Sequence, residues 1–392
     1  MNGKIAVIGS GNAGVISSLM SLYSLWDFAD CYDCPELKNI EITVFHDPKI
    51  KREIVGQGTT INVSNAIRKV LKVDERLDNP AGITPKVGFF YKNWARKNNE
   101  LLYKLGGGGM AYHYDPGLLR DTFLKSDIVN FVEGNFEPKD IPEEYDIVFD
   151  CRGKTANDWN EYDMVESPVN CCLLGRVNCL RGPEVWTENI ATPDGWCFKI
   201  PLIDGYSYGY VFNDKITSIE EAKINFEKLF NVKTINVVPF NNYIAKNFTD
   251  DNRIFKNGNR LFFFEPLEST ATPMYGNFVQ GVIEGFCSEN LEYQKSFYRE
   301  KIYEVHDWIL WHYFYGSNYN TKFWKYAQEL SRSHKYSQKF LERVKYVRDT
   351  CNYERDSGNN MFPDSLDGEF SYVDYQEWFF NNNQSSIPLS SR

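Results

Sequence analysis

Two ionisable side chains lie beside apolar segments in which a charge is costly. Lys86 stands at the start of the strand-like segment KVGFFY, and Glu268 follows the run LFFF and Pro266. A lysine on a partly buried strand loses hydration, which lowers its pKa and increases the neutral amine that can react. A carboxylate acts as a general base when it lies within hydrogen-bond reach of the proton. The residues alone leave two interpretations open for each side chain: a reactive amine or a lysine with its ammonium group in water, and a base or a glutamate that stabilises a helix N-terminus.

A glycine-rich segment near the N-terminus has the spacing of a dinucleotide-binding turn. In GSGNAG, Gly9, Gly11 and Gly14 fit G-x-G-x-x-G between an apolar strand pattern and a helical pattern. The first glycine makes the turn, the second lets the backbone approach a pyrophosphate, and the third lets the helix pack on the strand. The helix N-terminus, with Asn12 and Ala13, favours negative phosphates. The segment predicts dinucleotide binding, with a plain glycine turn as the alternative, and does not distinguish NAD from FAD.

An acidic residue that binds the ribose is expected after the second strand of such a unit. His46 stands where the acid is expected, and Asp47 follows it. Asp47 is therefore the candidate ribose ligand.

A second anion site is predicted further along the chain. Ser269, Thr270 and Ala271 precede Pro273 and a run with helical apolar spacing. Backbone amides at the start of a helix point outward and favour negative charge. Capping of the helix by residues 269–272 is the alternative, and both roles can hold together.

These residues must be positioned by an α/β fold. Apolar patterns predict strands over 4–8, 40–45, 86–91, 128–132, 146–149 and 261–264, and helices over 13–28 and 115–125. The first helix lies between the first two strands, so we expect these strands to be parallel. Asp115 is expected to cap the second helix, with Pro116 at its first position. We expect Lys86 to share its strand face with Gly88 and Phe90, because side chains alternate along a strand.

The middle and the end of the chain have different patterns. Between residues 170 and 248, alternating segments such as WCFKIPL and YSYGYVF are joined by Gly-containing turns, which predicts hairpins of a second, inserted sheet. From about Gly276 the apolar spacing becomes helical and stays so to the C-terminal third, and the tail SSIPLSSR is expected to be disordered. We expect a dinucleotide-binding module over 1–290, including a discontinuous substrate-facing sheet (about 86–94 and 170–265), and a helical substrate-binding module over 291–392.

Composition excludes several classes of protein. The chain has 392 residues, 42% of them hydrophobic, and no stretch approaches the roughly 20 apolar residues of a membrane helix. A net charge of -10 argues against nucleic acid and anionic membranes as partners. No export signal is recognised, and nine cysteines, an odd number, favour the reducing cytoplasm. Cys31 and Cys34 form one C-x-x-C without a second pair, so we expect a loop and no metal site.

Six ordered segments resemble those of the tryptophan-halogenase family of flavin-dependent halogenases. GSGNAG is the first, and VGQGTT at residues 55–60 is similar to V-G-E-A-T, with Gln57 and Gly58 in place of Glu and Ala. PKVGFFYKNW places Lys86 eight residues before Trp94, as in the family strand that carries its essential lysine. AYHYD at residues 111–115 is similar to the family's Y-H-x-D.

The remaining segments lie in the second half of the chain. GWCFKIPL is similar to W-x-W-x-I-P, keeping Trp196 but with Phe198 for the second Trp, and EPLEST matches P-L-E-S-T, with Ala271 where Gly is usual. DWILWHY and NTKFW, between residues 307 and 324, are similar to D-F-I-x-x-H-Y and D-T-P-F-W. The stretch after Trp94 lacks the family's His-containing segment that helps to hold tryptophan, which argues against free tryptophan as the substrate.

The resemblance implies a GxGxxG FAD-binding, hydroxylase-like flavoprotein fold with an inserted mixed β-sheet and a helical C-terminal module. It implies that FAD, supplied reduced as FADH2, and O2 convert a halide ion to hypohalous acid. Lys86 then passes the halogen, as a haloamine or through a hydrogen bond, to an electron-rich aromatic such as a phenol, indole or pyrrole. A separate flavin reductase would supply FADH2, and homo-oligomers are left open.

The resemblance also implies residue roles. Glu268 orients the electrophile or takes the ring proton, and the amides of Ser269, Thr270 and Ala271 bind halide. Trp196 and Phe198 shield the flavin, although core packing would also explain them. The implied flavin contacts are Gly9, Gly11, Asn12, Ala13, Gly14, Asp47, Gly56, Gln57, Gly58, Thr59, Pro266 and Leu267.

The histidines and the aromatic residues of these segments have separate expectations. His113, His306 and His312 are expected to be structural, hydrogen-bonded histidines. The aromatic residues of the helical region either line a substrate pocket or form its core; these are Trp308, Trp311, Tyr313, Phe314 and Trp324.

Two other functions stay open. An aromatic flavoprotein hydroxylase would keep GSGNAG without requiring Lys86 or Glu268. A non-catalytic flavin-binding or redox-sensing protein would fit the changes at Gln57, Gly58, Phe198 and Ala271.

Overall fold

A computed structural model describes residues 3–74, 76–94, 100–105, 110–154, 159–180, 182–249, 251–342 and 344, with the backbone alone for 101–104. The predicted disordered tail lies outside these residues. None of the helices in this part of the chain combines the length and the apolar character needed to cross a lipid bilayer.

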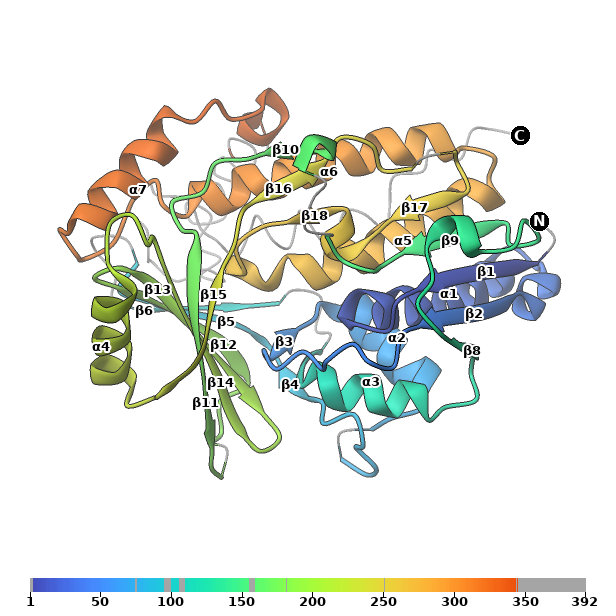
Figure 1. The fold of residues 1–392 in the computed structure, drawn as a ribbon, viewed down its shortest axis with the longest axis horizontal. Coiled ribbons are helices and arrows are strands. Elements are labelled where there is room, and N and C mark those ends of the chain that lie inside the picture. Colours follow the sequence, from blue (N-terminus) through green and yellow to red (C-terminus); the bar gives the residue numbers. More distant parts are fainter. Residues whose placement is uncertain are drawn as a thin grey trace, which may run out of the picture.

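A five-stranded parallel sheet holds the glycine-rich turn, on the right in Figure 1. Its order is β17 (Ile254–Lys256), β9 (Ile147–Asp150), β1 (Lys4–Ile8), β2 (Glu41–His46) and β8 (Asn130–Glu133). The predicted parallel pairing of the first two strands is confirmed. Near-continuous apolar runs such as IAVI in β1 are typical of strands buried on both faces.

A seven-stranded sheet, on the left in Figure 1, forms the second layer. Its order is β15 (Thr234–Pro239), β11 (Cys171–Asn178), β14 (Gly205–Phe212), β13 (Gly195–Leu202), β12 (Trp186–Thr192), β5 (Gly88–Lys92) and β6 (Glu100–Lys104). The sheet is mixed, since β12 and β5 are parallel and its other pairs are antiparallel. The predicted hairpin of WCFKIPL and YSYGYVF is β13 and β14.

Two three-stranded antiparallel sheets connect these layers. One consists of β3 (Gln57–Gly58), β7 (Ala111–Tyr114) and β4 (Thr84–Lys86), and the other of β10 (Tyr162–Met164), β16 (Tyr243–Ala245) and β18 (Phe262–Phe263). Short 3-10 helices are η1 (Pro35–Asn39), η2 (Pro138–Asp140), η3 (Trp159–Glu161), η4 (Gly258–Arg260) and η5 (Leu267–Ser269).

The helices cover the sheets. They are α1 (Asn12–Cys31), α2 (Ile61–Leu71), α3 (Pro116–Leu124), α4 (Ile219–Phe230), α5 (Ala271–Cys287), α6 (Leu291–Trp311) and α7 (Lys322–Ser333). The α1 helix packs against α2, α3 and α5, and α5 packs against α6. Asp115 caps α3 as predicted, accepting hydrogen bonds from the Gly117 and Leu118 amides at 2.8 and 3.1 Å.

The predicted strand over residues 86–91 is wrong, because it is two strands in two sheets. Lys86 pairs with Ala111 in the small sheet, whereas Val87 pairs with Val185 and Leu105 of the large one. The face expected for Lys86 is wrong for the same reason: its ammonium nitrogen lies 3.9 Å from the centre of the Phe89 ring. The break turns the lysine out of the large sheet and into the space between the layers.

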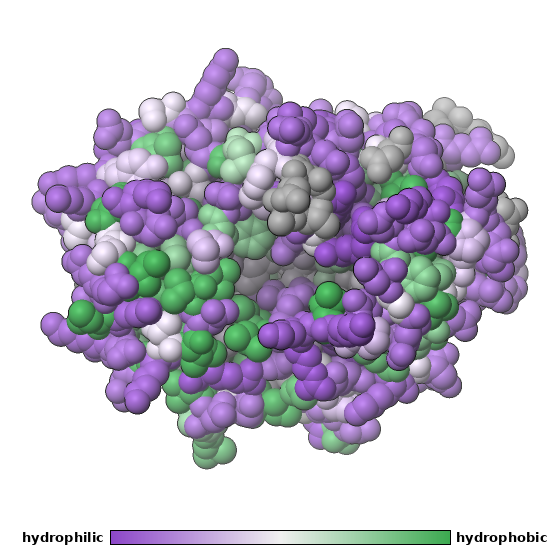
Figure 2. Space-filling model, viewed as in Figure 1, coloured by the Kyte–Doolittle hydropathy of each residue, from purple (hydrophilic) through white to green (hydrophobic). Residues whose placement is uncertain are grey.

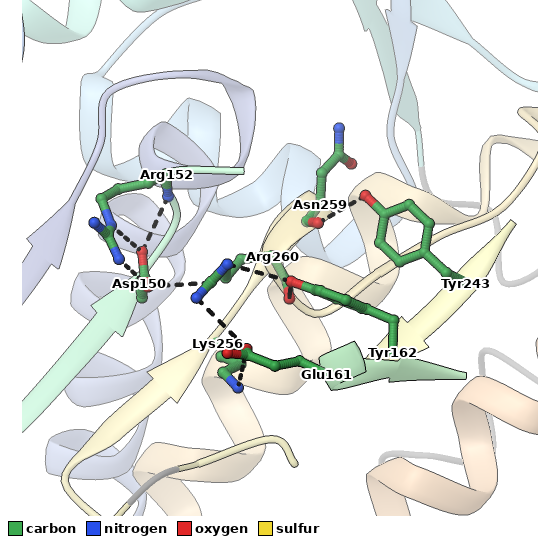
Figure 3. A network of polar contacts seen from close by, with 8 residues as sticks. All are labelled: Asp150, Arg152, Glu161, Tyr162, Tyr243, Lys256, Asn259 and Arg260. Carbon is green, nitrogen blue, oxygen red and sulfur yellow. Dashed lines mark hydrogen bonds and ion pairs between the residues drawn. The ribbon is translucent and has the colours of Figure 1, made fainter. Parts of the chain in front are cut away.

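A polar network joins the end of β9 to the inserted strands (Figure 3). Asp150, which is buried, accepts a hydrogen bond from Arg152 Nε at 2.8 Å, and its other oxygen lies 3.5 Å from Arg260 Nε. The Tyr162 hydroxyl of β10 donates to the Arg260 carbonyl at 3.0 Å. A buried carboxylate needs such partners, so this network fixes η4 and β10 against the carboxyl edge of the parallel sheet.

The molecular surface in the orientation of Figure 1 is largely hydrophilic (Figure 2). It is hollowed near its middle, between the two large sheets.

Gly209 makes room for an aromatic ring between β13 and β14. It lies opposite Phe198, and a Cβ at Gly209 would lie 2.1 Å from that ring. Gly209→Ala should lower the free energy of unfolding by about 1–3 kcal/mol, because a packed core does not accept the added methyl group without strain. Chemical denaturation measures this loss. Adding Phe198→Leu should recover part of it, and a Gly209→Ala variant as stable as its parent would show that the ring moves freely.

Candidate active site

The glycine-rich turn has the geometry that its spacing predicts. Gly9 has φ +106°, its amide donates to the Phe45 carbonyl at 2.8 Å, and a Cβ there would lie 2.9 Å from the Cys151 carbonyl oxygen. A Cβ on Gly14 would lie 2.0 Å from the Gly9 carbonyl oxygen. Both positions therefore require glycine, one for the turn and one for the packing of α1 on β1.

The N-terminus of α1 already binds a carboxyl oxygen, that of Glu53, whose pKa burial raises. The Asn12 amide donates to Glu53 Oε1 at 2.9 Å, and a Cβ on Gly11 would lie 3.2 Å from the same oxygen. A carboxyl group thus stands where the amides of a dinucleotide-binding helix receive phosphate. The Asn12 side chain also accepts from the Tyr114 hydroxyl at 2.6 Å and donates to Thr272 Oγ1 at 3.4 Å, which connects this turn to the start of α5.

The other predicted dinucleotide contacts lie on two further segments. Asp47 follows β2, is half-buried, and accepts a hydrogen bond from the Lys49 amide at 2.8 Å. The Gly56 amide donates to Ser207 Oγ at 3.0 Å, and the Thr59 amide donates to the Tyr112 carbonyl at 2.8 Å. Segment 55–60 is thereby held between β13, β14 and β7.

Lys86 is completely buried at the end of β4. Its Nζ donates to the Thr59 carbonyl at 3.3 Å and lies over the Phe89 ring. Burial lowers the pKa of Lys86 to about 7, and the negative charge of Glu268 opposes this shift. About half of the amine is therefore neutral at pH 7.

Glu268 lies in the turn before α5, and its charge acts on Lys86. The side chain is buried, and Glu268 and Ser269 have φ values of +65° and +51°, which non-glycine residues rarely adopt. Oε1 lies 3.3 Å from His312 Nε2, and Oε2 has no hydrogen-bond partner among the described residues. Burial raises the pKa of Glu268 above its usual range, although the contact with His312 and the charge of Lys86 oppose this shift.

The predicted anion-binding residues lie at the N-terminus of α5, which begins at Ala271 and so earlier than the sequence pattern indicates. Its first amides have no acceptor within the helix, as in any helix. The Ser269 amide already donates to the Pro266 carbonyl at 3.2 Å. Thr270 and Ala271 are therefore better placed than Ser269 to offer a backbone N–H to an anion.

Trp196 and Phe198 lie in β13, both buried, with their ring centres 6.1 Å apart. The Trp196 indole donates to Glu265 Oε2 at 3.4 Å, and the Tyr313 hydroxyl donates to the same oxygen at 2.8 Å. Burial raises the pKa of Glu265 to about 8. No spacing or motif in the sequence marks Glu265 as a site residue, although it opens the EPLEST segment.

Three histidines expected to be structural have clear partners. His113 Nε2 lies 2.8 Å from Thr187 Oγ1, and His306 Nε2 lies 2.6 Å from the Glu166 carbonyl. His312 contacts Glu268, which the sequence did not predict, since the two residues are far apart in the chain.

His306, Asp307 and His334 form the only group with metal-ligand spacing in the described part of the chain. Their polar atoms already bind one another and the backbone, with 2.8 Å between His334 Nε2 and Asp307 Oδ1.

The aromatic residues of the helical region are core rather than an open wall. Trp308, Tyr313 and Trp324 are almost wholly buried, and the Trp324 indole donates to the Thr192 carbonyl at 2.7 Å. Trp311 and Phe314 are half-buried and stack at 4.8 Å.

A family model described as tryptophan halogenase matches residues 145–381, more than half of the chain. The chain belongs to the tryptophan halogenase family. Tryptophan 6-halogenase ThaL of Streptomyces albogriseolus is 26% identical over 159 residues, which cover 38% of this chain and 30% of ThaL. Tryptophan 7-halogenase KtzQ of Kutzneria is 26% identical over 176 residues, 43% of this chain and 32% of KtzQ. The chain thus spans about a third of the length of the curated relatives that it matches.

Solved structures share the fold over nearly the whole chain, which confirms the predicted fold class. A tryptophan halogenase from Shewanella frigidimarina has a TM-score of 0.71 at 14% identity, covering 97% of this chain and 93% of its own. BrvH, a flavin-dependent halogenase from Brevundimonas, has a TM-score of 0.69 at 15% identity, covering 97% and 90%.

One departure from the motifs of the tryptophan halogenase family lies against Lys86. Gly58 stands in place of Ala, and a Cβ there would lie 3.0 Å from Lys86 Nζ and 3.1 Å from Ser269 Oγ. Because Gly58 has no methyl group, the Lys86 amine and the Ser269 hydroxyl both lie next to its Cα. In this member of the family, Gly58 thus joins the lysine to the start of α5.

The buried lysine should titrate near neutral pH. NMR of labelled Lys86 should show a midpoint near pH 7. In Glu268→Gln the midpoint should fall further, because loss of the carboxylate charge removes the interaction that favours the ammonium form. A wild-type midpoint above pH 10 would show that the amine keeps its hydration.

Proposed function

We propose that this chain is a flavin-dependent halogenase that uses reduced FAD, O2 and halide to halogenate an electron-rich aromatic compound. Lys86 carries the proposal: a buried lysine whose pKa lies near 7 stands between a candidate flavin loop, a candidate halide site and a buried glutamate. The names of the relatives, tryptophan halogenases and flavin-dependent halogenases, support the same reaction class.

The residues at the N-terminus of α1 fit a flavin pyrophosphate, because the Asn12 amide already binds a carboxyl oxygen there. Gly9, Gly11, Asn12, Ala13 and Gly14 would hold the phosphates. Asp47 would bind the ribose, and the segments 56–59 and 266–267 would contact the ring system. Bound reduced FAD would supply, with O2, the oxidation of halide to hypohalous acid. Trp196 and Phe198 would keep the aromatic substrate away from the flavin.

Halide would bind at the N-terminus of α5, where the amides of Thr270 and Ala271, with Ser269 beside them, favour an anion. This place adjoins Lys86 through Gly58. An oxidised halogen formed there therefore reaches the amine before it reaches bulk solvent.

The neutral Lys86 amine has a lone pair that can take the halogen. The N–halogen bond forms as the oxygen–halogen bond breaks, and the hydroxide leaves with an amine proton as water. Glu268 then removes the proton from the halogenated ring carbon, so that the ring regains its aromatic electrons.

The substrate class, the two modules and the reductase are those expected from the sequence. The substrate would be a phenol, indole or pyrrole rather than free tryptophan, held between a dinucleotide-binding module (1–290) and a helical module (291–392). A separate flavin reductase would deliver reduced FAD in the cytoplasm, where the eight described cysteines, all free, stay reduced.

Replacing Lys86 should abolish halogenation without loss of flavin binding. The assay contains FAD, a reductase, O2, chloride, bromide or iodide, and an aromatic panel, with products read by mass spectrometry and leaked oxidant scavenged. Lys86→Met keeps the volume but has no amine, so we expect no halogenated product. Lys92→Met is the control, because Lys92 lies on the neighbouring strand and pairs with Glu188 at 3.0 Å. Undiminished product from Lys86→Met would refute the proposal.

The same assay separates the other functions. Oxygenated but not halogenated products would indicate a flavoprotein hydroxylase, and flavin binding without any product would indicate a binding protein.

Glu268 should be needed for turnover. Glu268→Gln should lower kcat by about 10²-fold or more, because the amide cannot take the ring proton. Glu284→Gln, in α5 but away from Lys86, is the control, and circular dichroism checks the fold. Wild-type kinetics for Glu268→Gln would remove the residue from the mechanism.

A further inference from the structure

A histidine at the end of α6 completes the buried site. The His312 side chain is fully buried, and its Nδ1 lies 2.8 Å from the Trp308 carbonyl oxygen. Its Nε2 lies 3.3 Å from Glu268 Oε1 and 3.3 Å from the Tyr91 hydroxyl.

These contacts constrain the protons of the pair. A carbonyl oxygen only accepts, so Nδ1 must carry a proton. If His312 were neutral and Glu268 ionised, the Nε2 lone pair would face a carboxylate oxygen in a buried space. Two arrangements avoid this repulsion: the Tyr91 hydroxyl donates to Nε2, or a proton lies between Nε2 and Oε1.

Glu265, in the same loop, shows how burial changes the pKa of a glutamate that has no histidine partner. Glu265 is as buried as Glu268, but its described partners are the neutral donors Trp196 and Tyr313. Its pKa is raised to about 8, so it is mostly protonated at neutral pH. Glu268 faces the same burial, and His312 is the partner that opposes it most strongly.

We propose that His312 is a positioning residue that carries the shared proton on Nε2 as an imidazolium, which keeps Glu268 ionised and leaves Oε2 as the base. This inference rests on the proposed function. Oε2 is buried and has no hydrogen-bond partner among the described residues, so it is the oxygen whose lone pairs are left for a substrate proton.

The proton transfer balances within the site. The ring carbon gives its proton to Oε2 and keeps the electron pair of the broken C–H bond. The N–halogen bond of Lys86 has returned its electron pair to nitrogen, and Glu268 passes the proton to that nitrogen. His312 keeps its proton throughout. At the end of the cycle Lys86 is again a neutral amine and Glu268 is again a carboxylate.

The position of the proton can be measured without flavin or substrate. In histidine-labelled protein at pH 7, nitrogen-15 NMR should show both ring nitrogens of His312 protonated, with the signal assigned by its loss in His312→Gln. Carbon-13 NMR should show Glu268 ionised in the wild type and protonated in His312→Gln. An unprotonated Nε2, or a protonated Glu268 in the wild type, would overturn the inference.

Kinetics provide a second test. In His312→Gln, which has no positive charge, the acidic limb of the kcat profile should move up by about one pH unit or more. Activity should recover at high pH, with KM for the aromatic unchanged. His306→Gln, in the same helix but bound to the Glu166 carbonyl, should leave the limb in place.

The other titratable groups facing the pair are Lys86 from β4 and Tyr91 from β5, and both are kept in these variants. Glu265 and His113 lie on neighbouring segments and bind Tyr313 and Thr187.

An equal loss of activity at every pH would show that His312 is only structural. A wild type that forms no halogenated product would instead refute the proposed function, and the NMR result would still decide where the proton lies.

Discussion

The burial of ionisable groups between two layers is the constraint on which the site depends. Lys86, Glu268 and His312 are each almost wholly removed from water. A charge in such a place is stable only beside an opposite charge or a hydrogen-bond partner, so each group sets the protonation of the next. The lysine becomes a weaker base, and the neighbours of the glutamate oppose the rise in its pKa that burial causes. The chemistry proposed for this site needs both effects at once.

The three residues stand where secondary-structure elements begin or end, namely at the end of β4, before the start of α5 and at the end of α6. The β4 strand stops at Lys86, because the next residue joins the large sheet. The α5 helix starts after two residues with positive φ, each costing about 1–3 kcal/mol. The α6 helix ends at His312. Each of these side chains thus stands at the end of an element, and the sheets and helices packed around them supply the burial that offsets the strain.

The sequence predicts those features of the fold that depend only on residues close together in the chain. The glycine turn, the cap at Asp115 and the hairpin of β13 and β14 follow from spacing alone. The contact between His312 and Glu268 joins residues 44 positions apart and has no local signal. The break after Lys86 was also missed, because Val87 is apolar and reads as a continuing strand, and the choice of sheet depends on Val185 and Leu105. The contact of Glu53 with the Asn12 amide could not be predicted either, since no motif around Glu53 indicates that it binds the N-terminus of α1.

The two glutamates of the EPLEST loop are equally buried but have different partners, and burial raises the pKa of both carboxyl groups. Glu265 accepts from an indole and a phenol, which are neutral donors, and burial leaves it mostly protonated at pH 7. It therefore adds little negative charge to the site while it anchors Trp196. Glu268, three residues later, faces an imidazole and an amine. In the proposed mechanism the carboxylate charge belongs to Glu268, whose charge acts on Lys86, and because the neutral Glu265 does not compete for that amine, a single base acts on a single halogen carrier.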